Sequence, residues 1–414
     1  MKKLVALLLA LTLCIGLCAC GATAEKPAEE TPATTGETET PATAAKDIKV
    51  GFIFLHDENS TYDLNFINAA KAAAAELGLS DDQVMMKTNI AESQACYDAA
   101  AELVDAGCDL VITDSFGHES FALAAAKDFP EVQFVSCTGV KAHTEGLSNF
   151  HNAFASIYEG RYLAGVAAGL KLNEMIENGD ITAEEAKMGY VGAYPYAEVK
   201  SGYTSFFLGA RSICPSVTME VTFTSSWYDE ALEKEAANKL INNGCVLISQ
   251  HADSMGALTA CETAGVPNVS YNGSTVAACP NTFIVSSRID WTPFFVYAIN
   301  CVTAGEDIGY DWTGTLATGS VVLTDVNEAA AAAGTADKIA EVMKSLEDGS
   351  LKVFDTATFT VNGETLTTYL ADVDDLGDYV GETEVISDGV FLESFYRSAP
   401  YFDLDIDGIT NLDA

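Results

Sequence analysis

The sequence predicts an α/β protein with two parallel sheets, each covered by helices on both faces. Short hydrophobic runs of strand length alternate with stretches whose apolar residues recur at helical spacing. The 414 residues favour two or three domains at about 150 residues each. With 49% hydrophobic residues, the chain has enough apolar material for more than one buried core.

Strands and helices alternate along the chain from residue 48. Apolar runs predict strands at 48–55, 84–86, 109–113, 132–136, 188–192, 217–223, 246–249 and 268–271. The recurrence of Phe66, Ala70, Ala73 and Leu77 predicts a helix after the first strand. Further helices are expected around 96–103, over 119–127 and over about 157–172. This order is typical of parallel sheets joined by crossover helices.

The N-terminus resembles a signal peptide followed by a tether. Lys2 and Lys3 precede an apolar run over 4–17, which is short for a bilayer core about 30 Å thick. The run ends in Leu-Cys-Ala-Cys-Gly, which resembles a lipobox, so we expect residues 1–20 to be a lipoprotein signal with Cys20 as the lipidated residue. The alternative is an ordinary signal cleaved after Ala19. Residues 21–46 hold no aromatic residue, Val, Leu, Ile or Met, and we expect a disordered tether there.

The charge excludes one class of partner. The chain has 21 Lys plus Arg against 60 Asp plus Glu, a formal net charge of −39. A nucleic-acid partner requires a basic surface, so none is expected, and an anionic small ligand is disfavoured.

The cysteines do not predict a metal site. Eight lie beyond the signal, none in a C-x-x-C pair, and most lie in apolar surroundings. We expect small buried side chains and no zinc. The segment 403–408 resembles the first half of a calcium-binding loop, but its twelfth position is Ala414, so calcium is disfavoured and no cofactor is expected.

Candidate ligand-binding residues follow the predicted strands, because open parallel sheets bind ligands beyond the carboxyl ends of their strands. The loops are 56–63, 114–118, 194–198, 225–229, 250–254 and 271–274. They carry aromatic rings such as Tyr62 and Phe116, together with carboxylates and amides, and almost no cations. Such a set suits a flat, neutral ligand that forms hydrogen bonds, for example a purine.

Six ordered motifs resemble the basic membrane protein family, the PnrA-like substrate-binding lipoproteins of ABC transporters. They are VITDSFG (111–117), YEGRYLAG (158–165), GYVGAYP (189–195), LGARS (208–212), SWYD (226–229) and QHADS (250–254). The resemblance runs from about 48 to 304 and is strongest to the subgroup similar to the Med lipoprotein. The loop 56–62 departs from the glycine-rich pattern usual in the family.

The resemblance implies a type I periplasmic-binding-protein fold: two Rossmann-like lobes, a hinge crossed three times, and a ligand bound between the lobes. It implies a purine nucleoside or base as ligand. The implied binding positions are Ser115, Phe116 and Gly117 on one lobe, Trp227, His251 and Asp253 on the other, and Asn272, Asp290 and Trp291 on the return. Tyr62 joins them as an aromatic residue of the first loop.

The expected lobe boundaries follow from this fold. The first lobe comprises 48–155 and about 286–305, and the second about 156–285 and about 306–353. Residues 354–414 form a C-terminal extension of unassigned position.

Several site residues have a structural alternative. Phe116 is expected to stack on the ligand, because a core residue would lie on a strand, and Trp227 either stacks on the ligand or packs within a lobe. Asp253 either binds ligand or caps a helix, and a lone loop histidine such as His251 is often structural. We expect Asp229 to cap a helix and Arg161 to pair with an acid.

No catalytic motif is present: the chain lacks H-E-x-x-H, a P-loop and G-x-G-x-x-G, so an enzyme is not expected. The predicted function is that of a monomeric extracytoplasmic binding protein, lipid-anchored to the cell membrane, which delivers its ligand to ABC permease subunits. The alternatives are a signalling lipoprotein of the same fold, or the binding of another neutral solute such as a sugar.

Overall fold

The computed structural model describes residues 48–377 and 379–413, which belong to one compact unit. The predicted signal, the tether and Cys20 lie outside the described residues. In the part of the chain that is described, no helix has the length and apolar character needed to cross a bilayer.

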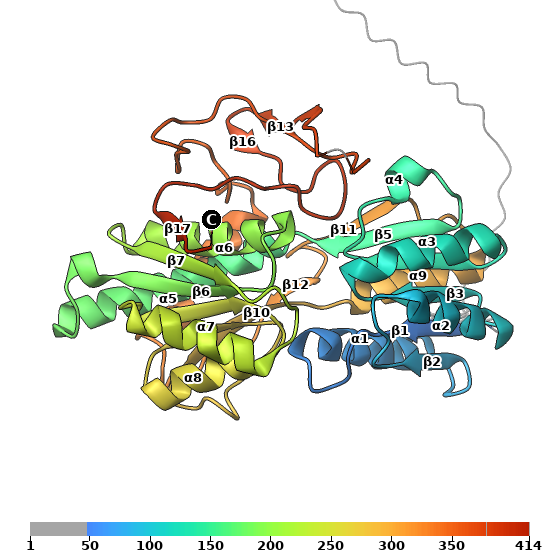
Figure 1. The fold of residues 1–414 in the computed structure, drawn as a ribbon, viewed down its shortest axis with the longest axis horizontal. Helices are drawn as coiled ribbons and strands as arrows, with labels where there is room; N and C mark the ends of the chain where they lie inside the picture. Colours follow the sequence, from blue (N-terminus) through green and yellow to red (C-terminus); the bar gives the residue numbers. More distant parts are fainter. Residues whose placement is uncertain (1–47, 378, 414) are drawn as a thin grey trace, which may run out of the picture. The chain divides into compact units, whose positions relative to one another are not determined.

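The first sheet has six strands, all parallel, in the order β11-β5-β4-β3-β1-β2 (Figure 1). Their bounds are β1 (Val50–Ile53), β2 (Val84–Lys87), β3 (Leu110–Thr113), β4 (Gln133–Cys137), β5 (Phe150–Ala155) and β11 (Asp311–Gly314). The covering helices are α1 (Thr61–Leu77), α2 (Gln94–Asp105), α3 (Glu119–Asp128) and α9 (Thr292–Ala304), with the short η1 (Phe116–His118) and α4 (Ala142–Glu145). Two apolar clusters, one with α1 and α9 and one with α2 and α3, bury its two faces. We call this unit the first lobe.

The second sheet has seven strands in the order β12-β10-β9-β8-β6-β7-β17, and only β12 runs antiparallel to its neighbour. Their bounds are β6 (Lys187–Gly192), β7 (Thr218–Phe223), β8 (Leu247–His251), β9 (Asn268–Tyr271), β10 (Phe283–Ile289), β12 (Val321–Leu323) and β17 (Ile409–Asn411). One face packs against α5 (Ile157–Asn178), α6 (Ala197–Ile213) and α10 (Thr335–Glu347), and the other against α7 (Glu230–Asn242) and α8 (Gly256–Ala264). The 3₁₀ turn η2 (Ala183–Glu185) precedes β6. We call this unit the second lobe.

The chain passes between the two sheets three times: from β5 to α5, from β10 to α9, and from β11 to β12. Two strands lie in a different lobe from the one predicted for their residues. Residues 286–289 were expected in the first lobe, yet they belong to β10, which pairs with β9 and β12 of the second. Residues 311–314 were expected in the second lobe, yet they form β11, which pairs with β5 of the first. Strand pairing therefore moves the second crossing to about residue 290 and the third to 314–321.

The C-terminal extension packs on the second lobe. Its last strand, β17, adds to the sheet edge by pairing in parallel with β7, and Phe354, Phe391 and Phe402 enter the core of that lobe (Figure 1). Two short antiparallel pairs complete it: β13 (Leu370–Ala371) with β14 (Thr383–Glu384), and β15 (Ile386–Ser387) with β16 (Val390–Phe391).

All eight cysteines in the described residues are buried and free, as the sequence predicts. Burial raises the pKa of several of these thiols, for example that of Cys96 to about 12, so they behave as small apolar side chains.

Candidate functional site

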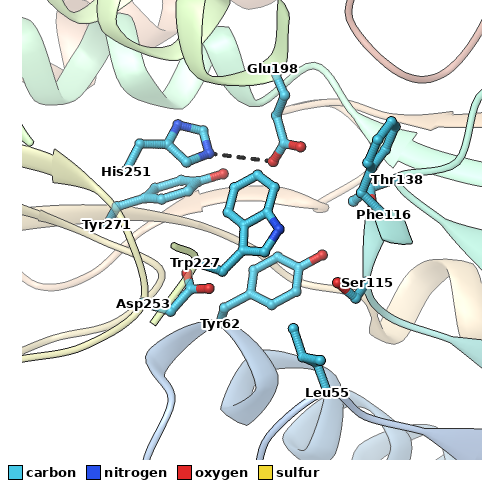
Figure 2. A pocket seen from close by; sticks show the side chains of 10 residues that line it. All are labelled: Leu55, Tyr62, Ser115, Phe116, Thr138, Glu198, Trp227, His251, Asp253 and Tyr271. Atoms are coloured by element: carbon cyan, nitrogen blue, oxygen red, sulfur yellow. Dashed lines mark hydrogen bonds and ion pairs between the residues drawn. The ribbon is translucent and has the colours of Figure 1, made fainter. Parts of the chain in front are cut away.

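Ten side chains from both lobes line a cavity between them (Figure 2). They are Leu55, Tyr62, Ser115, Phe116 and Thr138 of the first lobe, and Glu198, Trp227, His251, Asp253 and Tyr271 of the second. The space among these side chains that is free of protein atoms is about 340 Å³, open solvent included, and the centre of a water molecule can occupy only about 20 Å³ of it. A ligand with a ring system therefore requires some rearrangement of these side chains.

The strands position this set at their carboxyl ends, as expected for open parallel sheets. In the first lobe, Leu55, Ser115 and Thr138 follow β1, β3 and β4. In the second lobe, Trp227 follows β7, and His251 and Tyr271 are the last residues of β8 and β9.

Aromatic rings from both lobes meet beside the cavity. Phe116 keeps 37% of its surface exposed, and its ring centroid lies 5.7 Å from that of Tyr196 across the gap between the lobes. Tyr196 stacks on Tyr194 with ring centroids 5.0 Å apart, and Tyr194 forms a T-shaped pair with Trp227 at 5.2 Å. Trp227 also packs against the core of the second lobe, so it both lines the cavity and fills its own lobe. These rings give flat surfaces on which a planar ligand can stack.

Asp253 joins the two lobes at the cavity. Its backbone N–H donates to the carbonyl of Trp227 at 2.9 Å, and its carbonyl accepts from the backbone N–H of Thr61, in the first lobe, at 3.2 Å. It does not cap α8, because Ser254 Oγ accepts from Gly256 N instead. Burial, reinforced by the negative charge of Asp63, raises the pKa of the Asp253 carboxyl well above its usual range.

His251 and Glu198 form a polar pair on the wall of the cavity. His251 Nε2 lies 3.3 Å from Glu198 Oε1, as the dashed line in Figure 2 marks. Burial lowers the pKa of His251, so the ring is neutral at pH 7, and a carboxylate can only accept. The Nε2–H of His251 therefore donates to Glu198.

The hydroxyl groups of Tyr62 and Ser115 bond to protein groups. Tyr62 Oη donates to the carbonyl of Asp114 at 2.6 Å, and Ser115 Oγ donates to Glu92 Oε1 at 2.6 Å. The two residues thus present fixed surfaces to the cavity.

Four of the ten predicted site residues do not line the cavity. Gly117 donates its N–H to Glu92 Oε1 at 2.9 Å, and Asn272 Nδ2 donates to Asp253 Oδ1 at 3.4 Å. Asp290 Oδ1 accepts from the N–H of Thr292 at the start of α9. Trp291 is 1% exposed and stacks on Phe66 at 4.5 Å in the core of the first lobe. These four residues therefore contact other protein residues and do not form part of the cavity wall.

The other six predicted residues line the cavity together, and the predicted set of site residues did not include Leu55, Thr138, Glu198 or Tyr271. Glu198 and Tyr271 belong to loops that were predicted to bind ligand, so their positions in the sequence could have indicated that they line the cavity. Thr138 adopts a left-handed backbone, with φ of 64°, which its sequence does not indicate.

Two other predictions have clear outcomes. Asp229 caps α7, accepting from Ala231 N at 3.0 Å and Leu232 N at 2.9 Å, as expected. The prediction that Arg161 pairs with an acid is wrong. The guanidinium of Arg161 is fully buried and donates to Tyr190 Oη and Ser249 Oγ, each at 2.9 Å. It also lies 5.0 Å from the centre of the Tyr271 ring. Polar and aromatic groups hold this charge in place of an acid.

The lining is aromatic and rich in hydrogen-bond acceptors, and none of the described residues that form it is lysine or arginine. Two lobes with their strand ends facing a shared cavity, joined by three crossings, define a two-lobed solute-binding protein. The sequence model of the PnrA-like ABC transporter substrate-binding proteins matches residues 55–351, and the chain belongs to this family.

Known relatives agree with this family. A purine-binding protein of Brucella abortus is 31% identical over 267 residues, which cover 64% of this chain and 71% of that protein. A candidate ABC transporter glucose-binding protein of Haloferax volcanii is 34% identical over 187 residues, 45% of this chain and 44% of that protein.

Solved structures show the same fold. An ABC transporter solute-binding protein from Conexibacter woesei matches with a TM-score of 0.59 at 20% identity, covering 74% of this chain and 98% of that one. A solute-binding protein from Aeropyrum pernix matches with a TM-score of 0.61 at 17% identity, covering 77% and 94%. The expected type I periplasmic-binding-protein fold is thereby confirmed.

Proposed function

We propose that this protein captures a purine nucleoside or purine base between its two lobes and delivers it to an ABC permease. The observation that carries the proposal is the cavity itself, in which aromatic rings from both lobes accompany the carboxyl groups of Glu198 and Asp253. Planar bases stack on such rings, and their N–H groups and ribose hydroxyls donate to carboxyl oxygens. The purine-binding relative supports this choice of ligand.

The same proposal places the protein outside the cytoplasm, anchored through a lipid on Cys20 of the lipobox-like sequence. A phosphorylated ligand fits the cavity poorly, because the described residues that line it supply carboxyl groups and neither lysine nor arginine. Ligand binding would favour the closed arrangement, since only there do both lobes contact the ligand at once.

Titration calorimetry tests the ligand. We expect adenosine, guanosine, inosine or adenine to bind the purified chain, and glucose, ribose and amino acids to give no heat. Glucose binding without purine binding would support the sugar alternative, which the glucose-binding relative suggests, and would overturn the purine proposal.

Truncating Phe116 tests the stacking. A stacked base contributes about 1–3 kcal/mol, so Phe116→Ala should weaken binding of the best purine by about 5- to 150-fold. Phe395→Ala, at a residue of the C-terminal extension that is 72% exposed, is the matched control and should bind normally. Unchanged affinity of Phe116→Ala would refute a stacking role for this ring.

A further inference from the structure

Glu198 lines the cavity, and only one of its two carboxylate oxygens is bonded to another described residue. It lies in the first turn of α6, with 14% of its side chain exposed, and Figure 2 shows it directed toward the cavity from the second lobe. The N-terminal end of a helix favours a negative charge at this position.

One oxygen of the carboxylate is fixed by a stack of buried groups. His251 holds Oε1 at 3.3 Å, the His251 ring packs 4.5 Å from that of Tyr271, and the guanidinium of Arg161 lies 5.0 Å from the same tyrosine ring. His251 and Tyr271 are almost completely buried, so this arrangement is rigid. It sets the orientation of the carboxylate.

The other oxygen, Oε2, forms no hydrogen bond with any described residue. It therefore remains available as an acceptor beside the rings of Trp227 and Phe116, which line the same cavity. A base that stacks on these rings presents its edge in the plane of its own ring, where an acceptor selects for an N–H group.

We propose that Glu198 is a specificity-determining residue, which accepts a hydrogen bond from an N–H group on the edge of the bound base. This inference rests on the proposed function. It follows that purines with an exocyclic amino group bind more tightly than otherwise identical purines without one, because the carboxylate oxygen then has no donor to face.

Pairs of ligands that differ only in the 6-amino group provide the test: adenosine with purine riboside, and adenine with purine. By calorimetry, we expect the wild-type protein to bind the amino member of at least one pair about tenfold more tightly or better. Glu198→Gln should lose that preference, because His251 takes the amide carbonyl and the amide NH₂ then faces the base. Its affinity for the amino ligand should fall about tenfold or more, while that for the partner without the amino group changes less than threefold.

Glu235→Gln, at an exposed residue of α7, removes the same charge away from the cavity and should behave as wild type. Thermal unfolding of both variants within a few degrees of wild type shows that Glu198→Gln is folded. Equal wild-type affinities within each pair, or an equal loss of both members in Glu198→Gln, would overturn the role of Glu198 while leaving purine binding intact. Binding of guanosine or inosine but of none of the four compounds would overturn the amino-group preference alone. Failure of the wild-type protein to bind any of the four compounds, guanosine or inosine would overturn the proposed function, and this inference with it.

Discussion

At the scale of single residues, a buried carboxyl group holds loops beside the cavity in place. Glu233 of α7 is fully buried, and its Oε1 accepts from the backbone N–H groups of Asp229 and Ser254, each at 3.2 Å. It thereby holds the loop that carries Asp253. Burial raises the pKa of Glu233 from 4.5 to about 7, and that of Glu393, in the C-terminal extension, to the same value.

These raised pKa values predict how stability depends on pH. Between pH 4.5 and 7 each of these two carboxyl groups is protonated to a greater extent in the folded protein than in the unfolded chain, so its contribution to the free energy of unfolding falls as the pH rises through this window. The pKa shift of Glu233 corresponds to at most about 3 kcal/mol. Glu233→Gln, which cannot ionise, should therefore show a smaller loss of stability between pH 5 and 8 in urea unfolding. Glu235→Gln is the control, and an equal pH dependence in wild type and Glu233→Gln would contradict the prediction.

The sequence identified the cavity residues whose side-chain chemistry and place in a loop both point to ligand binding. It failed where only the path of the chain decides whether a side chain reaches the cavity. Phe116 and Trp227 are aromatic residues in loops after strands, and both line the cavity. Trp291 also follows a strand, yet its ring turns into the core of the first lobe. Leu55 resembles the last residue of a buried strand, and only the path of the chain after β1 brings it to the cavity.

At the scale of secondary structure, the contact between α5 and α6 depends on glycine. A Cβ atom added to Gly165 of α5 would lie 2.0 Å from the carbonyl oxygen of Phe206, and one added to Gly209 of α6 would lie 2.0 Å from that of Tyr162. Backbone atoms cannot move aside as a flexible side chain can. The two helices therefore approach so closely because neither glycine has a side chain.

Gly165→Ala tests this contact, because two effects oppose each other. Alanine favours an isolated helix by about 1 kcal/mol over glycine, whereas overpacking against backbone costs about 1–3 kcal/mol or more. We expect the clash to dominate and the urea midpoint to fall. Lys171→Ala, which removes a part-buried ion pair of α5 with Glu174, is the control and should change stability by less than about 1 kcal/mol. A rise in the midpoint of Gly165→Ala would show that the helices can separate without loss.

Two of the strands that the sequence missed, β5 and β10, carry polar residues at buried positions. β5 contains His151 and Asn152, both almost fully buried, and β10 contains Ser286, Ser287 and Arg288. Their hydrogen bonds explain the burial: His151 Nδ1 pairs with the carbonyl of Gly309 at 2.6 Å, and Asn152 Oδ1 accepts from Ala142 N at 2.7 Å. A search for hydrophobic runs does not find such strands, because their polar residues are buried through hydrogen bonds to residues elsewhere in the chain.

For the whole molecule, the C-terminal extension adds a contact between the lobes besides the three chain crossings. It is fixed to the second lobe by β17 and by the hydrogen bond from Ser201 Oγ to Glu393. Ser398 of the extension reaches β11 of the first lobe, where its N–H and its Oγ donate to Asp311 Oδ1 at 2.9 and 2.7 Å. Nothing in the sequence indicates this contact, because it depends on how the extension folds back over both lobes.

Asp311→Ala tests whether this contact favours the closed arrangement. Hydrogen bonds to a charged group contribute about 1.5–3 kcal/mol each when measured by deletion, and these two connect the extension to the first lobe. Their loss should lower the population of the closed form, so the radius of gyration by small-angle X-ray scattering should increase in Asp311→Ala. The affinity for the best ligand should also fall by roughly 3- to 10-fold, because closure then consumes part of the binding free energy. Asp180→Ala, at an exposed position beyond α5, removes an equal charge and should leave both measurements unchanged. An unaltered radius and affinity in Asp311→Ala would show that the extension follows the second lobe without restraining the first.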